Sequence, residues 1–285
     1  MKNTQQITKA MKQVAAAKIR RAEIAQRQAR PYADTLAEML HDLMGAVGTV
    51  DHPFMKPGKA GAPPAVLLVT ADKGLAGAFN SNVIRAAEQV ARELGNVSWY
   101  TVGVKARNAV RRLGNPDRPA WPLNAPSKLD TAREVARRVS DDFTEGAVSE
   151  VVLVSQKLVS MMSQKPESRQ LIPFQTSLTA SEWSGPGPEG GAQSAKSKGA
   201  VEFAGSPEFV LSRLLPKYLE FTIYSAMLET DAAFFAAQLI AMTNATDNAS
   251  KLIDELTIQM NNARQAAITK ELLEIVAGAE ALGVE

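Results

Sequence analysis

Apolar side chains recur every three or four positions along residues 3–55. This spacing is typical of one face of an α-helix, in which about 3.6 residues make a turn. The stripe consists of Ile7, Met11, Val14, Lys18, Ala22, Ala25, Ala29, Tyr32, Leu36, Met39 and Leu43, of which Lys18 alone is charged. The pattern predicts one long helix that Pro31 bends, because proline lacks a backbone N–H, and that ends at the glycines and prolines after residue 45.

Residues 64–175 change to short apolar runs that alternate with helical segments. Runs rich in β-branched residues predict strands, and the intervening segments predict helices. The strands are expected at 66–69, 97–102 and 151–155, and the helices at 82–94, 105–113 and 130–143. Repeated strand and helix units favour a largely parallel sheet covered by helices.

The last segment begins with Ser206 and Pro207, an N-cap residue followed by a proline at the first helical position. Pro216 is expected to break or kink this helix. Residues 217–282 contain no further proline and no glycine before Gly278, so they predict a continuous helix on the order of 100 Å long. Since a compact domain is much narrower, this helix must project from it.

A projecting helix with an apolar stripe needs a partner. The stripe consists of Leu239, Met242, Ala245, Ala249, Leu252, Leu256, Met260, Ala263 and Ala267. The first helix is the comparable one in the chain, and a compact domain connects the two, so an antiparallel pair is expected. Alanines at the seam would let the two backbones approach closely.

The predicted fold is therefore α/β: a long antiparallel coiled coil of N- and C-terminal helices plus a middle Rossmann-like α/β domain. Residues 184–200 are rich in Gly, Pro and Ser and have too few apolar groups to order themselves, so they predict a flexible loop. The expected division is an N-terminal coiled-coil helix at 1–60, an α/β middle domain at 62–178, a flexible loop at 179–205 and a C-terminal coiled-coil helix at 206–285.

Charge is balanced overall but not along the chain. The 32 basic and 30 acidic residues leave a net charge of +2, which is too balanced for a dedicated nucleic-acid binder. Residues 1–30 hold eight Lys and Arg and a single acid, Glu23, whereas residues 217–285 hold ten acids and four bases. This asymmetry suits two segments that lie together, or two that meet different partners.

Several functional classes are disfavoured because the chain lacks the residues that they need. It has no cysteine, so disulfides and thiolate sites are excluded. No run approaches the roughly 18 apolar residues that a membrane span needs, so membrane association is expected only through other proteins. His41 and His52 have no neighbouring nucleophile or metal partner in sequence and are interpreted as surface or linker residues. No catalytic set, metal site or cofactor site is expected, which favours mechanical or binding work.

Residues 72–77 follow a predicted strand and contain two glycines, as a phosphate-binding turn would. The segment matches neither the dinucleotide fingerprint nor the Walker loop, so a structural turn is favoured. Two alternatives stay open: an α/β nucleotide-binding protein with helical extensions, and a coiled-coil scaffold or nucleic-acid partner. Binding titrations with ATP or NAD, or with DNA at several salt concentrations, would separate them.

Three further segments are informative: residues 3–22 (NTQQITKAMKQVAAAKIRRA), residues 72–80 (DKGLAGAFN), and residues 241–249 (AMTNATDNA) with 263–279 (ARQAAITKELLEIVAGA). They resemble the γ-subunit family of F-type ATP synthases. The last is highly specific, and with the first it brackets the whole chain in the expected order.

The resemblance implies a non-catalytic central stalk, whose paired terminal helices enter the hexamer of α and β subunits. The middle domain would sit on the ring of membrane c subunits beside the ε subunit, at the cytoplasmic face of the bacterial plasma membrane. Proton flow would turn the ring, and the asymmetric shaft would drive the β sites through their states. No cofactor is implied.

The resemblance also implies roles for individual residues. Arg264 and Gln265 match a pair that contacts a β-subunit catch loop, with Thr269 and Glu271 just beyond. Lys18, Ile19, Arg20 and Arg21 match the segment that passes the acidic lever of β. Gly74, Leu75 and Gly77 match the turn of the middle domain.

The chain departs from the family pattern at a few positions. Ala233 and Phe234 replace Ser-Glu, Gln238 and Leu239 replace Arg-Met, Asn262 replaces a basic residue, and Ala76 replaces a cysteine. The first two changes make the C-terminal helix more apolar there.

Overall fold

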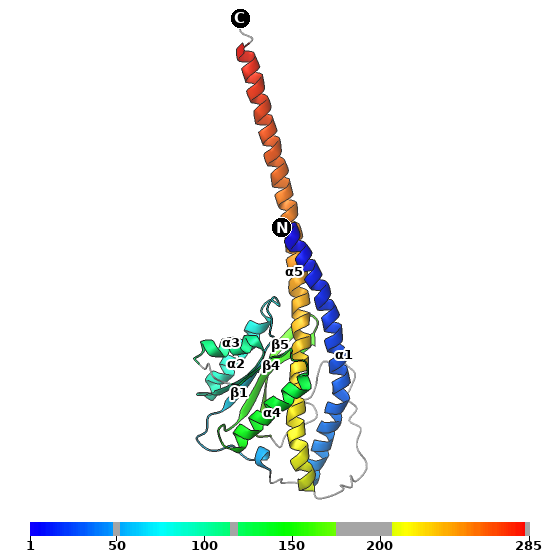
Figure 1. Cartoon of the computed structure of the whole chain (residues 1–285), viewed down its shortest axis with the longest axis vertical. Coiled ribbons are helices and arrows are strands. Elements are labelled where there is room, and N and C mark those ends of the chain that lie inside the picture. The colour runs from blue at the N-terminus through cyan, green and yellow to red at the C-terminus, as the bar shows by residue number, and fades with distance from the viewer. Residues whose placement is uncertain (48–51, 115–118, 175–206, 283–285) are drawn as a thin grey trace.

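The computed structural model describes residues 1–47, 52–114, 119–174 and 207–282. Two long helices, α1 (Lys2–Val47) and α5 (Pro207–Leu282), run side by side, and an α/β domain packs against them (Figure 1). The residues predicted to form the flexible loop, 179–205, lie outside the described ranges, as does the side chain of His41.

Neither proline interrupts its helix. Pro31 lies within α1 and Pro216 within α5, so of the predicted break or kink at Pro216 the break is wrong, and the kink stays a prediction. Both prolines are exposed, and a carbonyl that loses its helical donor on an exposed face can bind water instead.

The buried face of α1 follows a heptad spacing, as in a coiled coil. Its buried members include Ala15, Ile19, Ala22, Ala33, Leu36, Leu40 and Leu43. The predicted stripe was correct at Ala22, Leu36 and Leu43, and its members Met11, Ala25 and Ala29 are half-buried. Its other members, Ile7, Val14, Lys18, Tyr32 and Met39, are exposed. At Val14 and Tyr32 the small neighbouring residues Ala15 and Ala33 are buried instead.

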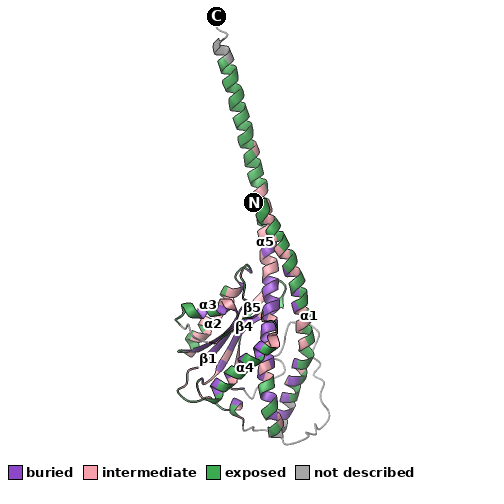
Figure 2. Ribbon diagram, viewed as in Figure 1, coloured by how far each residue is buried: buried purple, intermediate pink, exposed green. Residues whose placement is uncertain are grey.

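The pairing of α1 with α5 is antiparallel but covers only part of α5. Near the start of α1, the Gln5 amide donates to the Ser250 hydroxyl at 2.7 Å, and the Thr246 hydroxyl lies 2.9 Å from that of Thr8. From Lys251 onward α5 continues as a single, largely exposed helix (Figure 2). The expectation that the whole stripe to Ala267 is paired is therefore wrong, because the seam ends where α1 begins.

The middle domain has a five-stranded sheet in the order β3-β2-β1-β4-β5. The strands are β1 (Ala65–Val69), β2 (Ser98–Val102), β3 (Ala120–Trp121), β4 (Val151–Ser160) and β5 (Ser163–Ile172). The first four are parallel and β5 is antiparallel to β4. The three predicted strands are confirmed; β3 and β5 were missed, β3 because it is two residues long and β5 because it is a polar edge strand that contains Pro166.

Helices cover both faces of the sheet. Val66 and Leu68 of β1 pack beneath α2 (Phe79–Leu94) and α3 (Val104–Arg112), in a cluster with Val83 and Val110. Leu67 and Val69 point to the other face, where α4 (Lys128–Thr144), α5 and α1 supply the core. Helix α5 is thus both the partner of α1 and a layer of the α/β domain.

Candidate functional site

The predicted basic segment of α1 and the predicted turn meet on the same stretch of α5. Ile19 and Ala22 of α1 pack in one cluster with Ala71, Ala76 and Phe79 of the turn region, Leu158 of β4 and residues 232–237 of α5. The cluster joins four segments that lie far apart in sequence. It forms a joint between the helix pair and the α/β domain.

The basic segment divides into surface and core. Lys18, Arg20 and Arg21 are exposed, and the Lys18 ammonium lies 5.2 Å from the ring centroid of Phe235. Ile19 is only 3% exposed. Ile19 therefore belongs to the packing of the joint and offers no surface to a partner, whereas the three cations do.

Two polar side chains hold the turn at residues 72–77. The Asp72 carboxylate accepts hydrogen bonds from the backbone N–H groups of Val104 at 3.0 Å, Leu123 at 3.2 Å and Asn124 at 2.8 Å. The Asn80 amide accepts from the N–H of Ala71 and donates to the carbonyl of Lys73. These groups fix the ends of β1 and the start of α3, so they serve the fold.

The three predicted turn residues differ in what their backbone requires. Leu75 has a φ of 63° and is 63% exposed, an unusual combination for a residue with a side chain. Gly77 has a φ of 59° with open space around it, so its requirement is conformational. At Gly74 a Cβ would meet only the Lys105 side chain at 3.9 Å, which is ordinary contact.

Three of the residues noted above as departures from the resembled family, Ala76, Ala233 and Phe234, are part of the joint. Phe234 is buried against the ring of Phe79, with centroids 5.7 Å apart, and against Phe235 at 5.3 Å. Ala76 is also buried there. Sequence reasoning noted that this stretch is apolar, but it could not show that Phe234 contacts the turn, because the contact is not local.

A charged group lies beside the joint. The Asp231 carboxylate is 3.2 Å from the Lys128 ammonium of α4, and burial raises its pKa, although Lys128 and Lys18 oppose the shift. Sequence reasoning did not single out Asp231.

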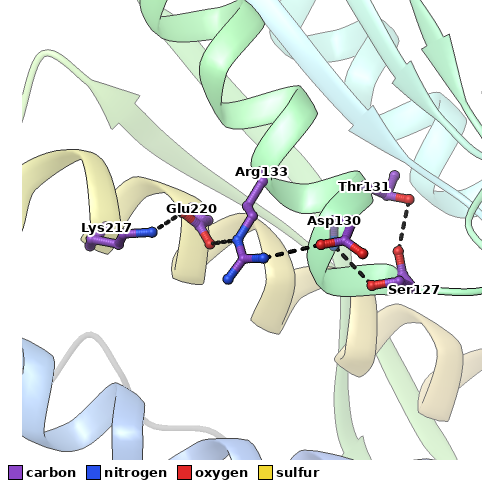
Figure 3. Close-up of polar contacts among 6 residues, drawn as sticks. All are labelled: Ser127, Asp130, Thr131, Arg133, Lys217 and Glu220. Atoms are coloured by element: carbon purple, nitrogen blue, oxygen red, sulfur yellow. Dashed lines mark hydrogen bonds and ion pairs between the residues drawn. The ribbon is translucent and has the colours of Figure 1, made fainter.

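A second set of polar contacts fastens α4 to α5 (Figure 3). The Arg133 guanidinium donates to Glu220 at 2.7 Å and to Asp130 of its own helix at 3.1 Å, and its pKa is raised chiefly by the bond to Glu220. Lys217 donates to the same Glu220 at 2.9 Å. At the start of α4, the Ser127 hydroxyl caps the helix by accepting from the Asp130 N–H. These contacts hold α5 on the domain at a second point.

Glu229 of α5 carries an unusual carboxyl. It accepts a hydrogen bond from the N–H of Leu158 at 3.2 Å, in the part of β4 that extends past its pairing with β1. Burial raises the pKa of Glu229 to about 7. The carboxylate covers a strand edge that has no partner in β1, at the cost of desolvating a charge.

We expect Glu229→Gln to change how stability depends on pH. Because the folded pKa lies near 7 and the ordinary value is 4.5, the wild-type chain should lose up to about 3 kcal/mol of unfolding free energy as pH rises through that interval. The variant should not lose this contribution. Denaturant titrations of both proteins near both ends of the interval measure the difference, and parallel pH profiles would contradict the assignment.

The predicted residues of the projecting end lie far from the joint. Arg264, Gln265, Thr269 and Glu271 are all exposed on α5, about 45 Å beyond the joint at the rise of a helix. The Thr269 hydroxyl donates to the Gln265 carbonyl at 2.9 Å. Ile258, Met260, Leu273 and Ile275 are exposed on the same helix, so this end presents apolar as well as polar side chains.

Within the described ranges no three His, Asp or Glu side chains are grouped as a metal ion would require. Within those ranges no helix is both long and apolar enough to cross a bilayer.

Comparison with known proteins places these features in a family. The model of the family described as ATP synthase matches residues 1–282. The ATP synthase gamma chain of Pelotomaculum thermopropionicum is 44% identical over 287 residues, which cover 99% of this chain and 95% of the relative. That of Heliobacterium modesticaldum is 41% identical over 288 residues, with 99% and 96% covered.

Solved structures have the same fold. The central stalk and c-ring structure of the Tetrahymena thermophila mitochondrial ATP synthase contains a chain that matches with a TM-score of 0.57 and 25% identity, covering 84% of this chain and 99% of that one. A chain of the Euglena gracilis mitochondrial ATP synthase rotor matches with a TM-score of 0.61 at 17% identity, covering 94% of both.

Proposed function

The chain belongs to the family of ATP synthase gamma chains, the non-catalytic central-stalk subunits of F-type ATP synthases, and from that premise we propose how its surfaces work. The projecting end of α5 enters the hexamer of α and β subunits. The joint and the α/β domain stay below it, on the c-ring beside the ε subunit. The complex is anchored at the cytoplasmic face of the bacterial plasma membrane, and this chain reaches the membrane only through it.

The observation that carries this proposal is the single helix beyond Lys251. Its apolar side chains, such as Met260 and Ile275, are exposed, and a helix without a packed face is marginally stable in water. Such a surface needs a partner that surrounds it. A cavity in a ring of subunits covers every side of the helix, whereas one further helix would cover a single side.

The polar residues of the projecting end act at the contact with the β subunits. We assign Arg264 and Gln265 to the β catch loop, with Thr269 and Glu271 adjacent. Arg264 is exposed and has no ion pair within the part of the chain that the structure describes, so its charge is available. As α5 turns, these groups contact one β subunit after another, and the contact biases the catalytic site of each β subunit in turn.

The cations at Lys18, Arg20 and Arg21 act at a second contact, the acidic lever of β. They lie on the exposed face of α1 at the joint, so force applied there passes to both the helix pair and the α/β domain. The turn with Gly74, Leu75 and Gly77 keeps this joint in shape.

Replacing Arg20 and Arg21 by Glu is expected to weaken assembly with the hexamer about three- to tenfold at low salt, and less at high salt, because exposed charges steer association and are screened. Both side chains are exposed, so folding should be unaffected. Surface plasmon resonance at two ionic strengths measures the effect. The matched control is Arg85→Glu on the exposed face of α2; equal losses in both variants would contradict the assignment.

Co-purification tests the proposal as a whole. Co-expressed with the α and β subunits of the same organism, the chain should elute as one complex with them, and alone it should not hydrolyse ATP. Elution apart from α and β would overturn the proposal.

A further inference from the structure

A cavity of about 230 Å³ lies where α1, α5 and the β4–β5 hairpin meet. Arg27 and Arg30 line it from α1, Lys157 and Leu158 from β4, Arg169 from β5, and Glu229 from α5. It adjoins the joint through Leu158, which belongs to both, and it lies apart from the projecting end. None of its lining residues is assigned to a partner contact in the proposed function.

The cavity carries a positive balance of charge. Its basic groups are the four named above, and its acids are Glu23, Glu167 and Glu229. Glu167 is engaged by Lys157 at 3.5 Å and by Arg169 at 3.9 Å. On the other wall, Arg30 has only a loose pair with Asp34 at 3.7 Å, and Arg27 has no ion pair among the described residues. The α1 wall therefore presents two guanidinium groups whose positive charge is little neutralised by ion pairs with carboxylates.

The deep part of the cavity is less polar. The buried Leu153 and Leu158 of β4 and Ala226 of α5 line it beside Glu229. Met161, which lies in the turn between β4 and β5 and is 41% exposed, also lines the cavity. Since the pKa of Glu229 is about 7, its carboxyl is neutral in a large fraction of molecules near neutral pH, and it then repels an anion less. Planar guanidinium groups bind phosphate oxygens in pairs, and an apolar floor suits an organic group.

We propose that this cavity binds a small phosphate monoester, with its phosphate at Arg27 and Arg30 and its organic group on Leu153, Leu158 and Met161. The volume supports an organic ester, because a lone oxyanion would leave most of it empty. A ligand seated there bridges α1, α5 and the hairpin, so it would stiffen the attachment of the helix pair to the α/β domain.

Calorimetric titration of the full chain with phenyl phosphate at about pH 8, where the ester is a dianion, tests the proposal. We expect saturable binding that weakens about tenfold or more in the double variant Arg27→Gln, Arg30→Gln, since two charge-assisted contacts are lost. The matched control is Arg137→Gln, an exposed arginine of α4, which should bind as wild type. Lys157→Gln, on the opposite wall, should weaken binding too.

A second titration identifies the ligand class and the role of Glu229. Sulfate, whose charge is constant between about pH 6 and about pH 8, should bind more weakly than phenyl phosphate. Its affinity should be higher at about pH 6 than at about pH 8, because protonation removes the Glu229 charge. The other charged groups that face the cavity are Glu23, Arg27, Arg30, Lys157, Glu167 and Arg169. The single substitution Glu229→Gln should abolish the pH effect.

Three results would overturn the proposal. They are the absence of saturable binding of phenyl phosphate, binding that the two Arg27 and Arg30 substitutions leave unchanged, and equal affinity for sulfate and phenyl phosphate. The last would assign the cavity to inorganic oxyanions. Assembly with α and β subunits is independent of all three, so failure here leaves the proposed function intact.

Discussion

Deleting residues 262–285 is expected to slow ATP synthesis by the assembled complex about tenfold or more while leaving the rest of the chain folded. The deletion removes Arg264, Gln265 and the exposed apolar residues of α5. The angle-dependent contact with the β subunits then loses on the order of 1.4 kcal/mol or more of interaction free energy, which corresponds to a factor of ten. Synthesis by membrane vesicles that carry the truncated chain measures the loss.

Stability of the isolated chain separates this effect from misfolding. Since the deleted part is exposed throughout its described residues, the free energy of unfolding should change by less than about 0.5 kcal/mol. A chain that lost its α/β core on truncation would show that the projecting end also supports the fold, against this account. Synthesis at the wild-type rate would show that the end carries no torque.

Phe234→Ala is expected to destabilise the chain by about 3–5 kcal/mol, the usual range for removing a buried aromatic side chain. Phe234 fills the joint between α5 and the turn and contacts the rings of both Phe79 and Phe235. Because the α/β domain meets α1 and α5 in this cluster, the variant should also loosen the domain from the shaft. Denaturant unfolding gives the free energy, and hydrogen exchange at β1 and α2 locates the change.

Phe209→Ala is the matched control for that substitution. Phe209 lies on the same helix but is 57% exposed, so its removal should cost less than about 1 kcal/mol. Similar losses in the two variants would mean that the joint is not a special point of attachment. A double variant with Phe79→Ala should lose less than the sum of the two single effects, because the two rings share one contact.

The long helices and the parallel strands could be predicted because their signals are local. Periodicity identified both helices, and runs such as residues 66–69 identified the strands. The seam between α1 and α5 was harder to predict. Both Tyr32 and Ala33 fit the helical period, and Ala33 is the buried one because of the residues that pack around it. The edge strand β5 carries half-exposed polar residues, so its sequence resembles a loop.

The contacts that connect the parts could not be predicted from local signals. Glu229 with Leu158, Arg133 with Glu220, and Phe79 with Phe234 each join residues more than 70 positions apart, and no motif marks them. The candidate partner contacts came instead from family resemblance. For Ile19 the resemblance identified the position as a partner contact but could not show that the side chain is buried.

Rotation of the chain inside its complex is the decisive test of its role as a turning shaft. The chain has no cysteine, so a single Arg107→Cys substitution on the exposed face of α3 allows a bead or gold rod to be attached at one defined place. With the α and β subunits immobilised and ATP supplied, we expect the probe to rotate in one direction. A probe that stays still while the same complexes hydrolyse ATP would contradict it.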